Sequence, residues 1–307
     1  MRNADLLHGA QIPGSPDMAV SSRKNWGTRL MLLAFGPGFI HIAAAATGQD
    51  VQHRIDAELD AGLPIIVHVV VALCDNVNQG IVPVPESIGN GQDPDANLYW
   101  GAMYGVRHFL PKEAGWSKVE AQKKGDSRIL ERAVFHTSVR RGPKDCPIYL
   151  VADAWDGAHL RGAMTAYFTM AAGALEEQIV IQHGDRELGL KAGGSAHLLF
   201  FVGHNGLMDF ALDPPSTSFP NVPPRAAAAL ACSSRFYFAE RLTAVGAHPL
   251  LLTTGLMAPE AYTLDAAVRE WASGGDRAST LAAAASSYHE YQRCGLKGAR
   301  RLFWGAD

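Results

Sequence analysis

The chain is poor in cysteine and has no strong excess of one charge. Its 307 residues include four cysteines (Cys74, Cys146, Cys232 and Cys294), without a Cys-x-x-Cys pair or a Cys/His cluster at the spacing of a zinc site. So few cysteines are typical of a fold stabilised by its core rather than by disulfides. The formal net charge is −3. Because phosphate binding needs a concentrated basic surface, we expect no nucleic-acid partner.

Sequence motifs of several common enzyme classes are also missing. The chain has no Gly-x-Gly-x-x-Gly or Gly-x₄-Gly-Lys-Ser/Thr loop, and a proline-containing run separates its glycine-rich stretch 89–91 from the preceding strand. It has no Gly-x-Ser-x-Gly and no His-Glu-x-x-His sequence either. These absences disfavour nucleotide-dependent enzymes, α/β serine hydrolases and metallopeptidases. We therefore expect neither a metal nor an organic cofactor.

The N-terminal part has no apolar run of the roughly 20 residues that a membrane-spanning helix needs. Its apolar segment 30–46 follows Arg23, Lys24 and Arg29 and precedes a polar stretch. This is the layout of a secretory signal peptide. We expect residues 1–48 to be a leader and linker, and the protein to be exported to the periplasm or secreted, with no stable membrane span. If 30–46 is instead a first core strand or helix, the protein is cytoplasmic.

Strand-like and helix-like segments alternate through the rest of the chain. The nearly continuous β-branched run 64–76, PIIVHVVVALCDN, is typical of a strand buried on both faces in the middle of a parallel sheet. Further strands are predicted at 129–139, 147–155, 197–203 and 248–254, and helices at 98–110, from 159, and at 234–245, 258–272 and 276–291. The alanine run 226–231 fits a short strand as well as a helix. Alternation of this kind predicts an α/β fold: a single three-layer α/β/α domain, residues 49–307, with a mostly parallel sheet.

Chemically capable residues follow several of these strands. In open α/β sheets the reactive site lies at the carboxyl ends of the strands. One strand ends at Cys74-Asp75, a second at Gly203-His204-Asn205-Gly206, and a third at Cys232-Ser233; Asp153 is expected at the end of a fourth. If these strands are parallel, all four groups emerge at one edge of the sheet.

A cysteine and a histidine at neighbouring strand ends suggest nucleophilic catalysis. Thiolate is the reactive form of cysteine and needs a base or a lowered pKa, and histidine can take and return the proton near neutral pH. Glycines beside His204 allow backbone N–H groups to approach a substrate carbonyl. The helix expected after Cys232 would favour a thiolate at its N-terminus. The alternatives are a structural turn histidine and a buried structural cysteine.

The blocks FFVGHNG and ALACSS resemble the signature of the caspase-like (clan CD) cysteine peptidases, in which a strand ending in His-Gly precedes a strand ending in Ala-Cys. The resemblance implies a caspase-hemoglobinase fold, His204 as general base and Cys232 as nucleophile. It implies an oxyanion site made by backbone N–H groups near Asn205 or Gly206 and at Cys232. The implied substrate is a polypeptide. The segment 74–106 is similar to a recurring part of uncharacterised bacterial proteins, which implies a bacterial origin.

Basic-specific members of this family place acidic residues around the pocket for the side chain before the scissile bond. Asp75 and Asp153 are therefore candidates for a substrate pocket, and loop capping or a structural role is the alternative for each. The chain departs from the family at Asn205, where a glycine is usual. A catalytically inactive binding or scaffold domain therefore stays open, as does a Rossmann-like small-ligand binder. The sequence makes no prediction about oligomeric state.

Overall fold

The computed structural model describes residues 45–123, 128–213, 219 and 222–305. Most of the predicted leader, residues 1–44, lies outside the described residues, so export stays a prediction. Helix α1 (Gly48–Asp60) begins where the linker was expected to end. Its start is fixed because the Thr47 side chain accepts a hydrogen bond from the Asp50 N–H, while Asp50 accepts one from the Thr47 N–H. Among the described helices, none combines the length and apolarity that crossing a membrane requires.

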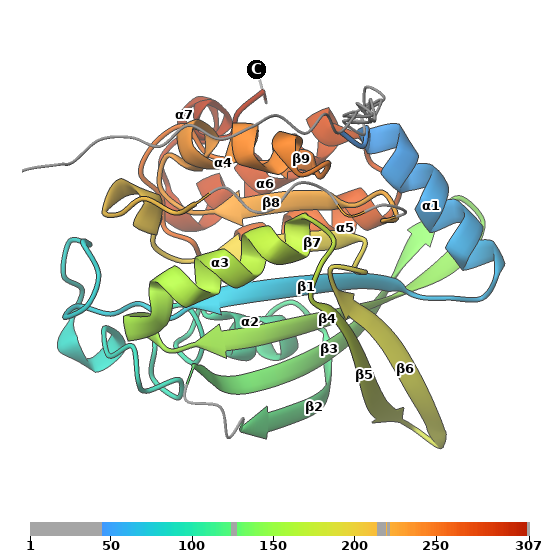
Figure 1. Ribbon diagram of the computed structural model, residues 1–307, viewed down its shortest axis with the longest axis horizontal. Helices are drawn as coiled ribbons and strands as arrows, with labels where there is room; N and C mark the ends of the chain where they lie inside the picture. Colours follow the sequence, from blue (N-terminus) through green and yellow to red (C-terminus); the bar gives the residue numbers. More distant parts are fainter. Residues whose placement is uncertain (1–44, 124–127, 214–218, 220–221, 306–307) are drawn as a thin grey trace, which may run out of the picture. The chain divides into compact units, whose positions relative to one another are not determined.

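A seven-stranded sheet forms the centre of the described part of the chain (Figure 1). Its strands, in spatial order, are β2 (Ser117–Lys123), β3 (Ile129–Arg141), β4 (Lys144–Trp155), β1 (Ile65–Ala72), β7 (Leu198–Val202), β8 (Ala226–Leu230) and β9 (His248–Leu251). The five strands from β4 to β9 are parallel, whereas β2–β3 and β3–β4 pair antiparallel. The predicted α/β class with a mostly parallel sheet is therefore confirmed.

Helices cover both faces of this sheet. One core contains residues of α1, α2 (Val106–Lys112), α5 (Ala261–Ala272), α6 (Arg277–Gln292) and α7 (Leu296–Leu302), and the other contains residues of α3 (Leu160–Ala171) and α4 (Ser234–Ala244). Successive side chains of a strand point to opposite faces. Accordingly, Val69 and Val71 of β1 enter the first core, while Val70 and Ala72 enter the second. This explains why β1 reads as a continuous apolar run.

Most of the alanine run 226–231 forms a strand, β8, rather than a helix. Its alanines alternate between the two cores, and each is fully buried between β7 and β9. The hydroxyl of Tyr167, in α3, donates a hydrogen bond of 2.9 Å to the Ala228 carbonyl. Small side chains let α3 come this close to the sheet, so tertiary packing outweighs the helix propensity of alanine.

The helix expected at 98–110 is mostly wrong, because only its end is helical, in α2. The preceding residues form tight turns around the buried Asn97 side chain. Asn97 Oδ1 accepts from the Cys74 N–H at 3.1 Å, and its Nδ2 donates to the Cys74 carbonyl at 2.8 Å. A Cβ atom on Gly101 or Gly105 would meet backbone atoms at 2.1 and 2.5 Å, so this loop is folded tightly against itself.

Two polar elements were not predicted at all. Strand β2 has an exposed or half-buried residue at each position. Strands β5 (Glu176–His183) and β6 (Arg186–Gly193) form a separate antiparallel hairpin beside the main sheet (Figure 1). Their apolar residues are few and lie between polar residues or glycines, so the sequence pattern is weak.

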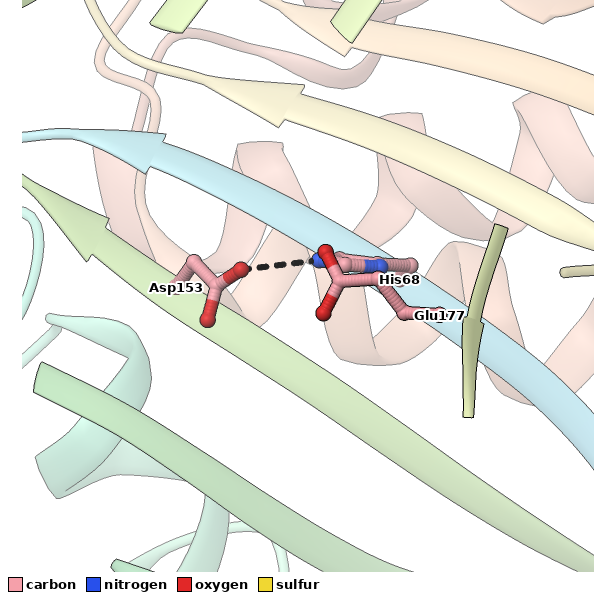
Figure 2. A group of neighbouring side chains, drawn as sticks. All are labelled: His68, Asp153 and Glu177. Carbon is pink, nitrogen blue, oxygen red and sulfur yellow. Dashed lines mark hydrogen bonds and ion pairs between the residues drawn. The ribbon is translucent and has the colours of Figure 1, made fainter. Parts of the chain in front are cut away.

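Asp153 does not end its strand, which corrects the prediction for this residue. β4 continues to Trp155, and Asp153 lies opposite Val70 in the sheet. Its carboxylate is fully buried and accepts two hydrogen bonds from Arg132, at 2.5 and 2.6 Å. His68 Nε2 lies 3.1 Å from the same carboxylate (Figure 2). Asp153 thus joins β1, β3 and β4 in the sheet interior instead of contributing to an open pocket.

The same cluster reaches the β5–β6 hairpin. Arg132 also donates to Glu177 of β5 at 2.6 Å, and the Gly193 N–H of β6 donates to His68 Nδ1 at 2.9 Å. Burial alone would raise the pKa of Asp153, but hydrogen bonds from Arg132 and His68 outweigh it and lower the pKa to about 2. The buried charge of Arg132 is therefore balanced at neutral pH.

We predict that Asp153→Asn lowers the free energy of unfolding by about 3–5 kcal/mol, because it removes the buried carboxylate that pairs with Arg132 and leaves only the half-buried Glu177 to balance that charge. Urea unfolding at neutral pH measures this. Since the folded pKa of Asp153 is depressed, its contribution is complete above the unfolded value of about 3.9 and is lost as pH falls toward 2. Asp145→Asn is the matched control, because its ion pair with Arg140 is exposed. Equal urea midpoints for the two variants would contradict the prediction.

Candidate active site

The structure brings the ends of β7 and β8 side by side. Val202 lies opposite Leu230, and the Gly203 N–H donates to the Leu230 carbonyl at 3.2 Å. His204 and Cys232 each follow two residues after this paired position. They therefore occupy neighbouring carboxyl ends of parallel strands, the place where open α/β sheets carry their sites.

Gly203, immediately before His204, has a structural reason to be glycine. Its φ of +148° is one that side-chain-bearing residues rarely adopt, and a Cβ atom would lie 2.7 Å from the Ala72 carbonyl oxygen. The close approach of β7 to the end of β1 thus requires glycine here. The His204 turn begins from this contact.

His204 is held by a carboxylate that the sequence did not identify. Its Nε2 lies 2.6 Å from Asp209 Oδ2, and the same oxygen accepts the Gly80 N–H at 3.2 Å. A Cβ atom on Gly80 would meet Asp209 Oδ1 at 2.5 Å, so glycine permits this approach. The ring itself is buried, with 7% of its surface exposed. Among the described residues, Nδ1 of His204 has no hydrogen-bond partner, which leaves it available to a reacting group.

Cys232 lies at a sharp turn between β8 and α4. Ser233, the next residue, has a left-handed φ of +52°, a conformation that non-glycine residues adopt mainly at functional or otherwise over-determined sites. The Ser233 N–H donates to the Gly255 carbonyl at 2.8 Å and fixes the turn. The half-buried Cys232 Sγ accepts the Met257 N–H at 3.4 Å. The thiol in turn donates to the Met257 carbonyl at 3.7 Å, so Sγ is held against the backbone of Met257.

Asn205 connects the two turns. Its fully buried side chain donates to the Cys232 carbonyl at 2.7 Å and accepts the Leu207 N–H at 3.2 Å. Its φ of −78° is ordinary, so this position does not require glycine. The Gly206 N–H donates to the His204 carbonyl at 3.0 Å, which disfavours Gly206 as the donor to an oxyanion. Within the described residues, the N–H groups of Asn205 and Cys232 have no acceptor.

Asp75 lies at the predicted edge of the sheet, but its carboxylate is hydrogen-bonded to residues of the loop that follows β1. Its buried carboxylate accepts hydrogen bonds from the N–H groups of Val77 and Asn78 and from the side chains of Asn78 and Gln92. Burial alone would raise the pKa of Asp75, but these hydrogen bonds lower it below the usual range. Asp75 also lines an open pocket of about 660 Å³ with Glu86 and Asp93. A role in substrate binding stays a prediction.

Cys74 is placed differently from Cys232. It is fully buried beneath the site, and burial raises the pKa of its thiol to about 11. At neutral pH it is therefore protonated and shielded from solvent. It lies two residues after β1, which ends at Ala72, and its environment suits a packing role.

His68, Asp153 and Glu177 are close enough to consider a metal, since one donor atom from each lies within 4.8 Å of the others (Figure 2). The Arg132 guanidinium, however, bonds both carboxylates. Because His68 Nδ1 accepts the Gly193 N–H, its Nε2 carries the proton directed at Asp153. These contacts leave no lone pair of the histidine for a cation, and the cluster is a structural ion-pair network.

The comparisons with known proteins add no relative. No family model, curated protein or solved structure matches this chain. The function must therefore be argued from the geometry of the site.

We predict that iodoacetamide at neutral pH alkylates the half-buried Cys232 and the exposed Cys294 of the folded protein, but not Cys74 or Cys146. The buried thiols are inaccessible, and burial raises the pKa of both. Peptide mass mapping of partial reactions measures the four rates. Labelling in guanidinium chloride, where all four should react, is the control. Reaction of Cys74 in the folded protein as fast as that of Cys232 would contradict the description of the site.

Proposed function

We propose that this chain is a cysteine peptidase of the caspase-like type, with Cys232 as nucleophile and His204 as general base. The observation that supports it best is the placement of the two residues at adjacent ends of β7 and β8, in the chain order of that family. The resemblance of FFVGHNG and ALACSS to the family signature supports the same assignment.

The contacts of His204 assign its two nitrogens to different tasks. Nε2 donates its proton to Asp209, so Nδ1 is the nitrogen that accepts the proton of the Cys232 thiol. Asp209 then acts as a positioning residue, since it fixes the ring and its tautomer and stabilises the imidazolium that forms. The Gly80 N–H in turn holds Asp209 in place.

The proposed reaction proceeds through a thioester. The Cys232 sulfur attacks the scissile carbonyl carbon, and the carbonyl oxygen gains negative charge facing the N–H groups of Asn205 and Cys232. The C–N bond then breaks while His204 returns its proton to the leaving nitrogen. Next, His204 takes a proton from water and the hydroxide attacks the thioester carbon. The C–S bond breaks, the carboxylic acid leaves, and His204 returns the proton to the Cys232 sulfur, which regenerates the thiol.

The surface around the site supports a polypeptide as substrate. Several large apolar side chains are exposed in segments next to the site: Val77 beside Asp75, Met208 in the turn after His204, Phe236 in the first turn of α4, and Leu256 beside Met257. An extended polypeptide presents apolar side chains in several directions and can contact such a dispersed set. A small polar ligand needs convergent polar groups in one enclosed pocket instead. These exposed residues are compatible with an extended polypeptide as substrate.

Asn205, which stands where the family usually has glycine, is the reason to consider a catalytically inactive scaffold domain. The backbone conformation of Asn205 weakens that alternative. Glycine is dispensable at this position because the backbone conformation is ordinary, and the N–H group keeps no partner among the described residues. The asparagine side chain adds a link to the Cys232 turn. The departure from the family pattern is thus compatible with an oxyanion site.

We predict that Cys232→Ala abolishes hydrolysis of a mixed peptide library, and that His204→Ala lowers the rate by roughly 10²–10⁴-fold. New peptide ends are counted by mass spectrometry, and thermal unfolding shows whether each variant is folded. Cys294→Ala, which removes an exposed cysteine far along the chain from the site, should leave the rate unchanged. Hydrolysis that persists in folded Cys232→Ala protein would exclude the proposed mechanism.

We predict that Asp209→Asn lowers kcat by about 10²-fold and leaves KM nearly unchanged. An asparagine amide can donate to Nε2, which would place the ring proton on Nδ1 and block the base. Steady-state kinetics on a cleaved library peptide measures both constants. Asp213→Asn, in the same loop, is the control for a general charge effect. A purely structural role for Asp209 would instead appear as a lowered melting temperature with unaltered kcat in the folded fraction.

A further inference from the structure

Two buried hydroxyl groups lie next to the Cys232 turn. Ser234, the first residue of α4, and Thr253, two residues after β9, are both fully buried. Their side-chain oxygens lie 3.2 Å apart, and each accepts the backbone N–H of the other residue, at 2.9 and 3.3 Å. The Ser234 hydroxyl also donates to the Ala229 carbonyl at 3.1 Å. The pair thus joins the ends of β8 and β9 to the start of α4.

The Thr253 hydroxyl fixes the peptide group that precedes Cys232. It donates a hydrogen bond to the Ala231 carbonyl, which also accepts the Ser234 N–H at 3.3 Å. The Ala231 carbonyl and the Cys232 N–H belong to the same peptide group. Because a peptide group is planar and almost always trans, its C=O and N–H bonds point in opposite directions. A carbonyl held toward Thr253 therefore turns the Cys232 N–H away from Thr253.

The Cys232 N–H itself has no hydrogen-bond acceptor among the described residues. The peptide group after Cys232 is held as well, because its carbonyl accepts from the Asn205 side chain at 2.7 Å and the Ser233 N–H donates to the Gly255 carbonyl at 2.8 Å. The left-handed φ of +52° at Ser233 lies between these contacts, and such a conformation persists only where the surroundings over-determine it. An N–H donor fixed in this way needs no reorganisation when negative charge develops on a bound carbonyl.

We propose that Thr253 is a positioning residue of the peptidase, whose hydroxyl sets the direction in which the Cys232 N–H meets the carbonyl oxygen of the substrate. This inference rests on the proposed function. Thr253 acts through the peptide group before Cys232 rather than by contact with the reacting atoms. Thr253→Val removes the hydroxyl and keeps the branched shape, which leaves the Ala231 carbonyl with only the longer hydrogen bond from Ser234. The peptide group can then tilt and carry the Cys232 N–H out of line.

The experiment uses the full-length protein and the best cleaved peptide of a mixed library. Thr253→Val should lower kcat by roughly 10- to 100-fold with KM nearly unchanged, a part of the cost of losing an oxyanion donor outright. Thr253→Ser keeps the hydroxyl and should retain most of the rate, and Thr253→Ala gives the same comparison if the valine variant does not fold. Thr280→Val is the matched control, because Thr280 is also fully buried and its hydroxyl donates to the Asp276 carbonyl at the start of α6. Its kcat should equal that of the wild type.

Alkylation separates this role from general damage to the turn. When the Cys232 sulfur displaces iodide from iodoacetamide, no negative charge develops on a carbonyl oxygen, so Thr253→Val should be alkylated at the wild-type rate while peptide hydrolysis falls. Equal losses in alkylation and hydrolysis, or an unchanged kcat in folded Thr253→Val protein, overturn the assignment of Thr253 while the peptidase stands. Absence of Cys232-dependent hydrolysis in the wild type overturns the proposed function and the assignment of Thr253 together.

Discussion

The parallel register of β1, β7 and β8 is the constraint on which the candidate active site depends. Val71 lies opposite Val202, which lies opposite Leu230, so residues far apart in the chain leave the sheet at one level. A slip of one residue would turn the side chains of a whole strand to the other face. The two separate apolar cores, each lined by every second residue of β1, make that slip costly. Gly203 then lets the His204 turn start directly from this register.

The sequence was most informative where apolar runs are long and end sharply. The runs leading to Cys74, His204 and Cys232 predict the parallel strands and their common edge, because burial on both faces leaves little choice of residue. Asp153 was misplaced for the opposite reason. A polar residue inside an apolar run resembles a strand end, and only the contact with Arg132 on a neighbouring antiparallel strand reveals that a carboxylate is tolerated in the interior. The amphipathic hairpin of β5 and β6 carries too few apolar residues to be recognised.

The supporting groups of the site were beyond sequence reasoning. Asp209 stands five residues after His204, in a turn whose course depends on the loop after β1, and no spacing rule predicts that loop. Whether a side chain is tolerated at position 205 can be decided only from the backbone conformation of Asn205. At φ −78° a side chain costs nothing, and the asparagine bridges the two turns that a glycine would leave unconnected. The placement of His204 and Cys232 after adjacent parallel strands was thus predictable, whereas the hydrogen bonds around them were not.

Gly80 and His204 hydrogen-bond to the same carboxylate oxygen of Asp209, and this limits which substitutions the protein can accept. The loop after β1 and the turn after β7 form one mechanical unit, so their substitutions should be strongly epistatic. A side chain at position 80 would be tolerated only after Asp209 had been shortened or moved. Substitutions in the loop after β1, which also lines the open pocket at Asp75, are therefore constrained by the contact that Asp209 makes with the histidine.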